Sequence, residues 1–578
     1  PIRIGASGVA DDFVVERSLR FNRGDNAQLS RTFSSGGNRK TFTFSAWCKV
    51  SVSNVHGAFF SGSKSGTGFF KFMFRNDGRL EVNTSENSLS DSTVIRTTRR
   101  FRDPTAWFHV VVAFDTTQGT ASNRVKIYVN GEQITDFDNN TFPPQNHDVT
   151  TNVDGEHQVG NQVGASNYYD GLMAEVHFIN GLQLTPSSFA ETNTETNQWV
   201  PKNTSGLTYG TNGFRLQFLD NSGTSATTLG KDTSGNSNNF TPNNFNVTAN
   251  SVENDSFIDT PSNNWCTLNP LTGFWNEGGE IPLADGNLTA QNPNSGDRAV
   301  HATFRLKSGK KYYIEGTYVE NSGSGSQTIW GLTTLTKNSG RPSKPAGTGG
   351  YSINWRGGAG TTQSHNDGST TNIGTRPSNN QVIGVAIDLV NGKFYAHRGN
   401  TYYNSGDPDN GTGAIITGIP TGVEYNFTVS LDSGGPNFSS FRLNFGQQGF
   451  QYQPSSFTDL LNSNSLDDPT ITLPTDHFDT LLYVGNNGSQ NITGLDFDPD
   501  WVWGKNRQDA GYHHDLYDTV RGDNLRIFSS QSSAEATGYL QFGVTGGFSL
   551  TAGGGINQNG KNHVAWCWNA GSSTVTNS

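Results

Sequence analysis

The stretch AWFHVVVAFDTTQGTASNRVKIYVNGEQI, residues 106–134, decides the fold class of this chain. Residues 110–114, VVVAF, form a short apolar run that is followed by a polar loop. In residues 125–129, VKIYV, β-branched residues alternate with other side chains, and this alternation is typical of a half-buried strand. Asn130-Gly131 then gives the strongest short hairpin signal, because both central residues of a type I′ turn need positive φ. The stretch predicts strand, loop, strand, tight turn and strand.

The same pattern returns later in the chain. Residues 382–388, VIGVAID, lead through Asn391-Gly392 into KFYA at residues 393–396. We therefore expect two antiparallel sandwiches of similar build in one chain.

Composition supports an all-β protein of several domains. A chain of 578 residues is too long for one hydrophobic core and predicts three or four domains. Charged residues make up only 15%, while the chain has 69 glycines and 37 phenylalanines. Many aromatic residues with little charge exclude a disordered chain and favour strands joined by many turns.

Charge argues against some classes of ligand, and cysteine content indicates the redox compartment. The formal net charge of −11 argues against nucleic acid as a ligand, because phosphate binding needs concentrated Lys and Arg. Cys48, Cys266 and Cys567 each stand beside a tryptophan, which predicts buried free thiols and suits a reducing cytoplasm. The sequence shows no signal peptide and no apolar run of membrane-spanning length, so we expect no membrane insertion.

Residues 13–200 are expected to form the first domain, after a short N-terminal arm at residues 1–12 that could attach to a partner. The segments KTFTFSAWCKV, WFHVVVAFD, VKIYVNGEQI and YYDGLMAEVHFINGLQLTPSSF resemble a laminin-G-like, concanavalin-type jelly roll. The resemblance implies binding of carbohydrate or protein by loops on one rim or face, sometimes with calcium.

Residues 201–264 are interpreted as an ordered connector packed on a domain, with a free linker as the alternative. Residues 265–455 are expected to form a second sandwich. Its segments KKYYIEGTYVE, VIGVAIDLVNGKFYAHRGN and FRLNFGQQGFQY resemble a SPRY domain, which implies a binding module rather than an enzyme. Residues 456–578 are expected to form a smaller β-rich domain.

The last domain resembles the uncharacterised β-rich domain that follows laminin-G-like and SPRY modules in fibre-like proteins of marine bacteriophages. The stretch that carries this likeness runs from DDPTITLPTDHFDTLLYVG to VAWCWNAG. The order of the three modules, with LGKDTSGNSNNFTP between the first two, is its most specific part. It implies a tail fibre or other receptor-binding virion protein, made in the host cytoplasm, homotrimeric, with other virion tail proteins as partners.

Catalytic carboxylates are not evident. Retaining glucanases of the concanavalin-type fold carry Glu-x-Asp-x-x-Glu on one strand, which puts alternate carboxylates on one face. The nearest run, Glu253-Asn254-Asp255, has Ile258 at the last position. Asp170 and Glu175 are five residues apart and would face opposite sides of a regular strand. We expect no enzyme activity, with a glycan-depolymerising tailspike as the alternative.

Calcium is the main cofactor for which the sequence offers ligands; His513 and His514 could also suggest a metal, but we interpret them as part of a hydrogen-bonded loop. Hard oxygen donors lie in loops beside the first hairpin, although Asp and Asn are also ordinary turn formers. The candidate ligands are Asp136, Asp138, Asp154 and Glu156.

Glycan binding needs exposed aromatic rings that stack on sugars, with polar side chains that bond the hydroxyls. Core packing is the competing explanation for each such residue. The candidates are Tyr168, Tyr169, Trp355, Arg356, His365, Asp367, Tyr402 and Tyr403. Together with the resemblance to phage fibre-like proteins, these residues lead us to expect a non-enzymatic phage fibre protein that binds a host surface polysaccharide or protein. A structural virion component, such as a head decoration or tail adaptor, is a further alternative.

Overall fold

The computed structural model describes residues 13–571, except 52–54, 65–67, 86–92, 195, 273–280, 293–295, 320–326, 335–349, 358, 434–438, 468–470 and 472. The N-terminal arm and its expected attachment therefore lie outside the described residues. The chain divides into two compact units, residues 1–466 (without 193–198) and residues 467–578 with 193–198. All sheets pair antiparallel, and an all-β fold is confirmed.

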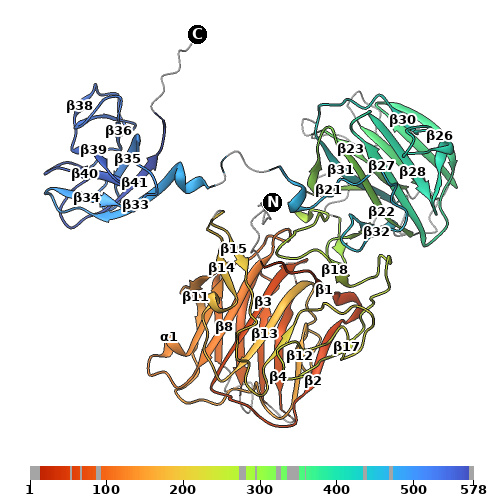
Figure 1. Ribbon diagram of the computed structural model, residues 1–578, viewed down its shortest axis with the longest axis horizontal. Helices are drawn as coiled ribbons and strands as arrows, with labels where there is room; N and C mark the ends of the chain where they lie inside the picture. The colour runs from red at the N-terminus through yellow and green to blue at the C-terminus, as the bar shows by residue number, and fades with distance from the viewer. Residues whose placement is uncertain are drawn as a thin grey trace. The chain divides into compact units, whose positions relative to one another are not determined.

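The first sandwich consists of two eight-stranded sheets (Figure 1). The first sheet has the order β10 (Glu132–Ile134), β9 (Val125–Val129), β8 (Phe108–Asp115), β3 (Thr41–Val50), β13 (Gly171–Asn180), β1 (Ser18–Phe21) and β18 (Ser256–Phe257), with β16 (Phe214–Leu216) on β13. The second has the order β11 (Phe137–Asn140), β7 (Thr93–Arg100), β6 (Arg79–Ser85), β5 (Phe69–Phe74), β4 (Gly57–Ser63), β12 (Glu156–Val159), β2 (Gln28–Thr32) and β17 (Thr241–Asn243).

The opening hairpin forms as predicted. Asn130 and Gly131 join β9 to β10 with φ of 48° and 84°, the left-handed geometry that a type I′ turn requires. The polar loop before β9 contains one helical turn, α1 (Ala121–Arg124).

Phenylalanine fills the space between the two sheets. Phe44 of β3 stacks on Phe60 of β4 with ring centroids 5.2 Å apart, which joins one sheet to the other. Phe42 stacks on Phe114 at 4.6 Å within the first sheet. This core explains the high phenylalanine content, since each buried ring removes a large apolar area from water.

Strand β3 alternates between two faces, and both faces are buried. All residues from Phe42 to Val50 are buried, because the outer face of β3 is covered by a loop that carries β14 (Ala190–Thr192) and β15 (Trp199–Pro201) and, at Lys49, by residues 259–265. Trp199 Nε1 donates to His109 Nδ1 on that face at 3.1 Å. The polar side chains Thr43, Ser45 and Lys49 on the outer face of β3 are therefore buried as well.

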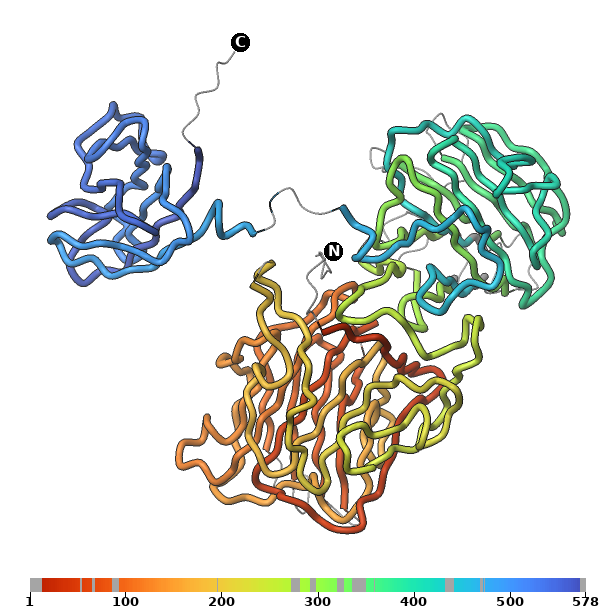
Figure 2. Tube along the Cα trace, in the orientation of Figure 1, coloured from red at the N-terminus to blue at the C-terminus, as the bar shows by residue number. Residues whose placement is uncertain are grey.

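The connector belongs to the first sandwich. Its strands β16, β17 and β18 pair with β13, β2 and β1, so residues 214–257 complete both sheets. Figure 2 shows this yellow to yellow-green segment running along the first sandwich. The predicted boundary at residue 200 therefore divides one folded body.

The second sandwich also has two sheets. The eight-stranded sheet has the order β19 (Leu283–Ala284), β20 (Thr289–Asn292), β32 (Ser439–Asn444), β22 (Lys311–Val319), β27 (Gln381–Asp388), β28 (Lys393–Arg398) and β29 (Thr401–Tyr402), with β30 (Ile416–Thr417) on β28. The other has the order β21 (Gly296–Leu306), β31 (Tyr425–Ser433), β23 (Gln327–Thr333), β24 (Tyr351–Arg356), β25 (Thr361–Asn366) and β26 (Ser369–Thr375). Leu461 and Leu466 pack on this core, so the body extends beyond the expected limit at residue 455.

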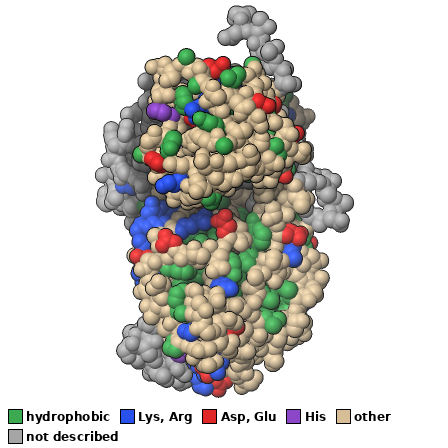
Figure 3. Space-filling view, turned by 90° about the vertical axis from the view of Figure 1, so that its left-hand side faces the viewer, with side chains coloured by type: hydrophobic (Ala, Val, Ile, Leu, Met, Phe, Trp, Pro, Cys, Tyr) green, Lys and Arg blue, Asp and Glu red, His purple; other side chains and the backbone are tan. Residues whose placement is uncertain are grey.

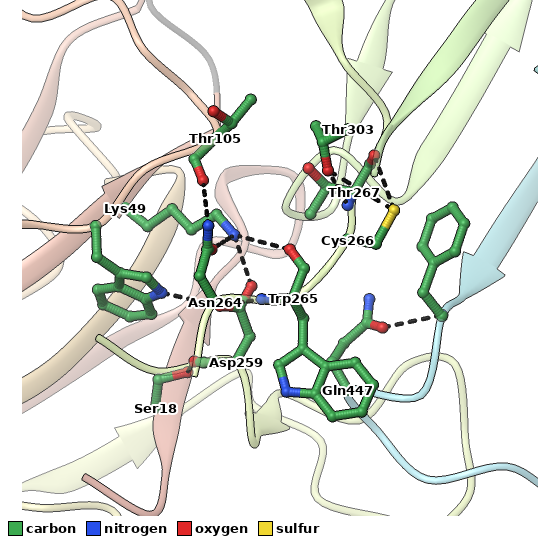
Figure 4. Close-up of polar contacts among 12 residues, drawn as sticks. Ser18, Lys49, Thr105, Asp259, Asn264, Trp265, Cys266, Thr267, Thr303 and Gln447 are labelled. Atoms are coloured by element: carbon green, nitrogen blue, oxygen red, sulfur yellow. Dashed lines mark hydrogen bonds and ion pairs between the residues drawn. The ribbon is translucent and has the colours of Figure 1, made fainter. Parts of the chain in front are cut away.

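A buried ion pair joins the first sandwich to the start of the second (Figure 4). Lys49 Nζ of β3 lies 2.8 Å from Asp259 Oδ2 and 2.7 Å from Asn264 Oδ1. Trp107 Nε1 donates to the other carboxylate oxygen of Asp259 at 2.8 Å. The side chains of Lys49 and Asp259 are 4% and 1% exposed, so each charge depends on the other for compensation.

The C-terminal unit has a six-stranded and a three-stranded sheet around a small core. The first has the order β33 (Phe478–Val484), β41 (Asn562–Trp568), β35 (Trp501–Asn506), β36 (Asp515–Asp518), β37 (Leu525–Phe528) and β38 (Ala536–Thr537). The second has the order β34 (Gln490–Thr493), β40 (Gly547–Leu550) and β39 (Leu540–Val544).

The surface carries few charges, and the thiols lie in the core. On the face in Figure 3, uncharged polar side chains and backbone outnumber charged groups, in line with the low charge content. The three cysteines are free and buried, as predicted. No helix in the described part of the chain is long and apolar enough to cross a membrane.

Candidate functional site

The second sandwich carries an open groove of about 450 Å³, which we call the tyrosine groove. Two segments far apart in sequence form it, residues 400–409 after β28 and residues 451–454 after β32. It combines aromatic rings with amides and carboxylates, the mixture that can cover the apolar face of a sugar and bond its hydroxyls. Its lining residues are Asn400, Tyr402, Gly406, Asp407, Pro408, Asp409, Gln451, Tyr452, Gln453 and Pro454.

Strand β22 supplies the support beneath the tyrosine groove. Tyr312 and Ile314 face the main core, whereas Tyr313 belongs to a separate outer cluster, because successive side chains on a strand alternate. Glu315 lies on the same outer face as Tyr313 and is 2% exposed. A carboxylate at that depth needs hydrogen-bond partners.

Glu315 ties the groove segment to the sheet. One carboxylate oxygen accepts the backbone N–H of Gln451 at 2.7 Å, and the other accepts that of Tyr452 at 3.2 Å and the Tyr313 hydroxyl at 3.0 Å. Burial raises the pKa of Glu315, against the lowering effect of these hydrogen bonds. Glu315 therefore positions the backbone that presents Tyr452.

His397 continues this network from β28. The backbone N–H of Asn400 donates to Nδ1 of His397 at 3.3 Å, so Nε2 carries the proton and donates to the Tyr313 hydroxyl at 2.7 Å. Burial lowers the pKa of His397 to about 3, which keeps the ring neutral at physiological pH. The neutral ring anchors the start of the groove loop through Asn400.

Gly384 makes room for the network. A Cβ on Gly384 would lie 2.2 Å from His397 Nε2 and 2.6 Å from the Tyr313 hydroxyl. Any larger residue at this position of β27 would displace both side chains.

Two aromatic rings of the groove pack around His397. The ring centroids of Tyr402 and Tyr452 lie 5.0 and 5.7 Å from that of His397. Within the described residues the buried Tyr402 hydroxyl has no hydrogen-bond partner, so the ring edge and not the hydroxyl is what Tyr402 offers to the groove. The Tyr452 hydroxyl accepts from Gln451 Nε2 at 3.0 Å.

Two carboxylates border the groove. Asp409 accepts the backbone N–H groups of Ser455 and Ser456 at 3.1 and 2.7 Å, which holds the two groove segments together. Asp407 accepts the backbone and side-chain N–H of Asn410 at 3.1 and 2.7 Å. These hydrogen bonds lower the pKa of both carboxyls, so the groove is negatively charged at neutral pH.

The structure places three predicted ligand residues in the core, which corrects that expectation. Trp355 has no exposed surface and its ring contacts Trp330 with centroids 5.1 Å apart. Tyr403 is 6% exposed and its hydroxyl donates to the Thr375 carbonyl. Tyr169 is 1% exposed. Buried rings of this kind cannot stack on a sugar.

The remaining candidates do not form one site. Tyr402 lies in the tyrosine groove, and Tyr168 is half-buried on the first sandwich. Arg356 is half-buried at the end of β24, and His365 is 8% exposed with Nδ1 on the Thr370 hydroxyl. Asp367 is exposed at the turn between β25 and β26. Only Tyr402 belongs to the groove.

The calcium candidates are engaged by other side chains. Asp138 forms ion pairs with Arg79 and Arg96, and Asp154 pairs with Lys64 at 2.7 Å. Asp136 accepts from the Thr98 hydroxyl, and Glu156 accepts from Gln158 Nε2. Among the described residues, no group of three His, Cys, Asp or Glu is placed to hold a metal ion.

Strand β13 has a β-bulge near Glu175, one of the two carboxylates that the sequence places near this strand. A bulge between Ala174 and His177 puts Glu175 at φ 47°, and its carboxylate pairs with Arg215 at 2.8 Å. Hydrogen bonding and charge from His177 and Arg215 outweigh burial and lower the pKa of Glu175 to about 2. Asp170 precedes the strand and does not share this pair, so no catalytic couple forms here.

Asp170 gives a testable pH dependence. Burial, with the nearby charge of Asp285, raises the pKa of Asp170 to about 7, and one of its oxygens has no partner in the described structure. The folded protein therefore favours the protonated carboxyl, so its stability falls as pH rises from about 4 to about 7. We expect Asp170→Asn to raise the free energy of unfolding by about 2 kcal/mol at pH 8 and to change it little at pH 4.

Chemical denaturation at the two pH values measures this difference. Asp154→Asn is the matched control, because the exposed Asp154 carboxyl has a pKa lowered by its hydrogen bond with Lys64 and should gain nothing at pH 8. A loss of stability of Asp170→Asn at pH 8 would contradict the prediction.

Sequence reasoning missed most of the groove. Tyr313, Glu315, His397 and Tyr452 were not predicted, although the alternation of KKYYIEGTYVE places a carboxylate on one face of a strand. A glutamate among β-branched and aromatic residues was the available signal. The hydrogen bonds from the backbone of residues 451 and 452 to Glu315 could not be predicted from the sequence, because they join segments that are far apart in the chain.

Comparisons with known proteins identify two parts of the chain. Residues 21–188 match the family model of the concanavalin A-like lectin/glucanases superfamily. Residues 473–578 match a family described as a domain of unknown function. No curated protein matches the chain.

Several solved structures are similar at low identity. Domains LG4-5 of the mouse laminin alpha1 chain are 9% identical with a TM-score of 0.25, covering 80% of this chain and 98% of that chain. The SPRY domain of human HERC1 is 8% identical with a TM-score of 0.23, covering 30% and 96%. Domain 4 of the arabinanase AbnA from Geobacillus stearothermophilus, in complex with arabinotriose, is 21% identical with a TM-score of 0.21, covering 26% and 65%.

Proposed function

We propose that this protein binds a glycan in the tyrosine groove without cleaving it. The observation that carries the proposal is the pair Tyr402 and Tyr452, held at the surface by a buried network and bordered by amides and carboxylates. The lectin/glucanase match of residues 21–188 supports the same class of function for a neighbouring part of the chain.

The hydrogen bonds of two carboxylates support binding without cleavage. Glycoside hydrolysis needs an acid and a second carboxylate free to act on the sugar. Glu315 already receives its hydrogen bonds from Gln451, Tyr452 and Tyr313 and sits below the groove. Asp409 accepts two backbone N–H groups, which lower its pKa and make it a poor general acid.

We expect Tyr402→Ala and Tyr452→Ala each to weaken glycan binding at least about tenfold, because each ring provides stacking and hydrogen bonding worth more than about 1.4 kcal/mol. Glycan-array screening of the full chain, followed by calorimetry on the best ligand, measures the loss. Tyr168→Ala is the matched control, since Tyr168 is a half-buried tyrosine of the first sandwich. Loss of binding in Tyr168→Ala alone would move the site to the first sandwich.

We further propose that the protein is part of a phage tail fibre, where it binds a host surface polysaccharide or protein as a homotrimer. The order of laminin-G-like, SPRY-like and C-terminal modules supports it. Incubating susceptible cells with purified protein tests it: blocked adsorption without released sugar fits a receptor binder, and released sugar fits a tailspike. Folded protein that neither blocks adsorption nor releases sugar fits a structural virion part. Sedimentation analysis gives the number of chains in the assembly. Repeating the binding assay with a chelator tests a calcium requirement.

A further inference from the structure

The charged side chains that line the tyrosine groove are all of one sign. Among its lining residues, the only charged side chains are Asp407 and Asp409, and no Lys or Arg is included. The nearby Lys393 is engaged elsewhere, since its Nζ donates to the carbonyl of Gly411 at 2.7 Å. An anionic group in the groove would therefore meet two carboxylates and no lining cation.

The charged hydrogen-bonding groups of the groove are acceptors. Each carboxylate of Asp407 and Asp409 accepts two N–H groups, and a carboxylate has about four acceptor sites. The Tyr452 hydroxyl already accepts one bond, and the side-chain amides of Asn400, Gln451 and Gln453 line the groove beside the carboxylates. A ligand that fills the remaining acceptor sites of Asp407 and Asp409 has to donate hydrogen bonds to them.

We propose that the tyrosine groove selects glycans without acidic substituents, whose hydroxyl or ammonium groups donate to Asp407 and Asp409. This inference rests on the proposed glycan-binding function. Uronate, sialate, sulfate and phosphate groups are rejected, because a like charge brought next to two carboxylates is repelled and loses hydration without a cation to replace it.

Titration calorimetry of the full chain with three tetrasaccharides tests the selection. Mannotetraose is the neutral probe, chitosan tetramer the ammonium probe and tetragalacturonate the acidic probe. We expect one of the first two to bind at least about tenfold more tightly than tetragalacturonate at low salt. We also expect added salt to weaken chitosan binding and to leave mannotetraose binding unchanged.

Charge variants at one position make the test specific. Asp407 is preferred over Asp409 because its hydrogen bonds stay within its own loop. Asp407→Asn should weaken binding of chitosan tetramer, and Asp407→Lys should increase the affinity for tetragalacturonate at least about tenfold. Melting temperatures equal to wild type confirm that the variants are folded.

The outcomes separate this inference from the proposed function. Tetragalacturonate bound more tightly than the other probes, and lost in Tyr402→Ala, would overturn the selection while keeping the groove as a glycan site. Binding of any probe that is unaffected by Tyr402→Ala and Tyr452→Ala would overturn the proposed site. No binding of any glycan in the array or of the three probes would overturn both.

Discussion

Replacing Lys49 with methionine is expected to lower the free energy of unfolding by about 3–5 kcal/mol. The substitution keeps the length and apolar stem of the side chain but leaves Asp259, whose side chain is 1% exposed, as an uncompensated buried charge. Asn264 and the carbonyl of Trp265 also lose the ammonium that they share. Equilibrium denaturation of the full chain, followed by tryptophan fluorescence, measures the change.

An exposed pair of the same length is the control. Lys64 Nζ and Asp154 Oδ1 lie 2.7 Å apart, but their side chains are 56% and 51% exposed. Solvent screens such a pair, so Lys64→Met should cause no measurable change. Equal effects of the two substitutions would show that burial of the Lys49 pair does not set its contribution.

Trp355→Ala is expected to cost about 3–5 kcal/mol, because it removes a fully buried indole from the core of the second sandwich. The neighbouring Trp330 would lose its edge-to-face contact, and the cavity left behind cannot collapse without moving the sheets. The unfolding transition of the second sandwich reports the loss.

Trp355→Phe separates packing from ligand binding. The smaller ring keeps part of the core contact, and Trp355 is absent from the lining of the tyrosine groove. We therefore expect unchanged glycan affinity with a smaller loss of stability. A loss of affinity in a Trp355→Phe protein that melts as wild type would return Trp355 to the set of ligand residues.

Local signals in the sequence predicted the strands well. Asn130-Gly131 marks its turn because few residues accept positive φ, and the cysteines beside tryptophans are buried. The second hairpin shows the limit of such signals. Gly392 has φ 63°, but Asn391 is not left-handed, and Asp388 instead accepts the N–H groups of Val390 and Asn391. The same dipeptide therefore forms part of a wider turn.

Whether an aromatic residue faces solvent could not be read from the sequence. Tyr402 and Tyr403 are adjacent, yet one lines the groove and the other packs in the core. Alternation shows that neighbours face opposite sides, but only the tertiary fold shows which side is covered. The groove also joins residues about 45 positions apart, 402–409 with 451–454, which no local pattern encodes.

The connector strands β17 and β18 are translated after the strands β2 and β1 with which they pair, so two strand edges stay open during translation. β1 and β2 emerge first, but β18 and β17, which cover their edges, are complete only at Phe257 and Asn243. At 5–20 residues per second, translation from residue 180 to 257 takes about 4–15 s. During that interval the nascent jelly roll presents two open strand edges to neighbouring chains on the same messenger, so slow translation of the connector would favour aggregation during expression.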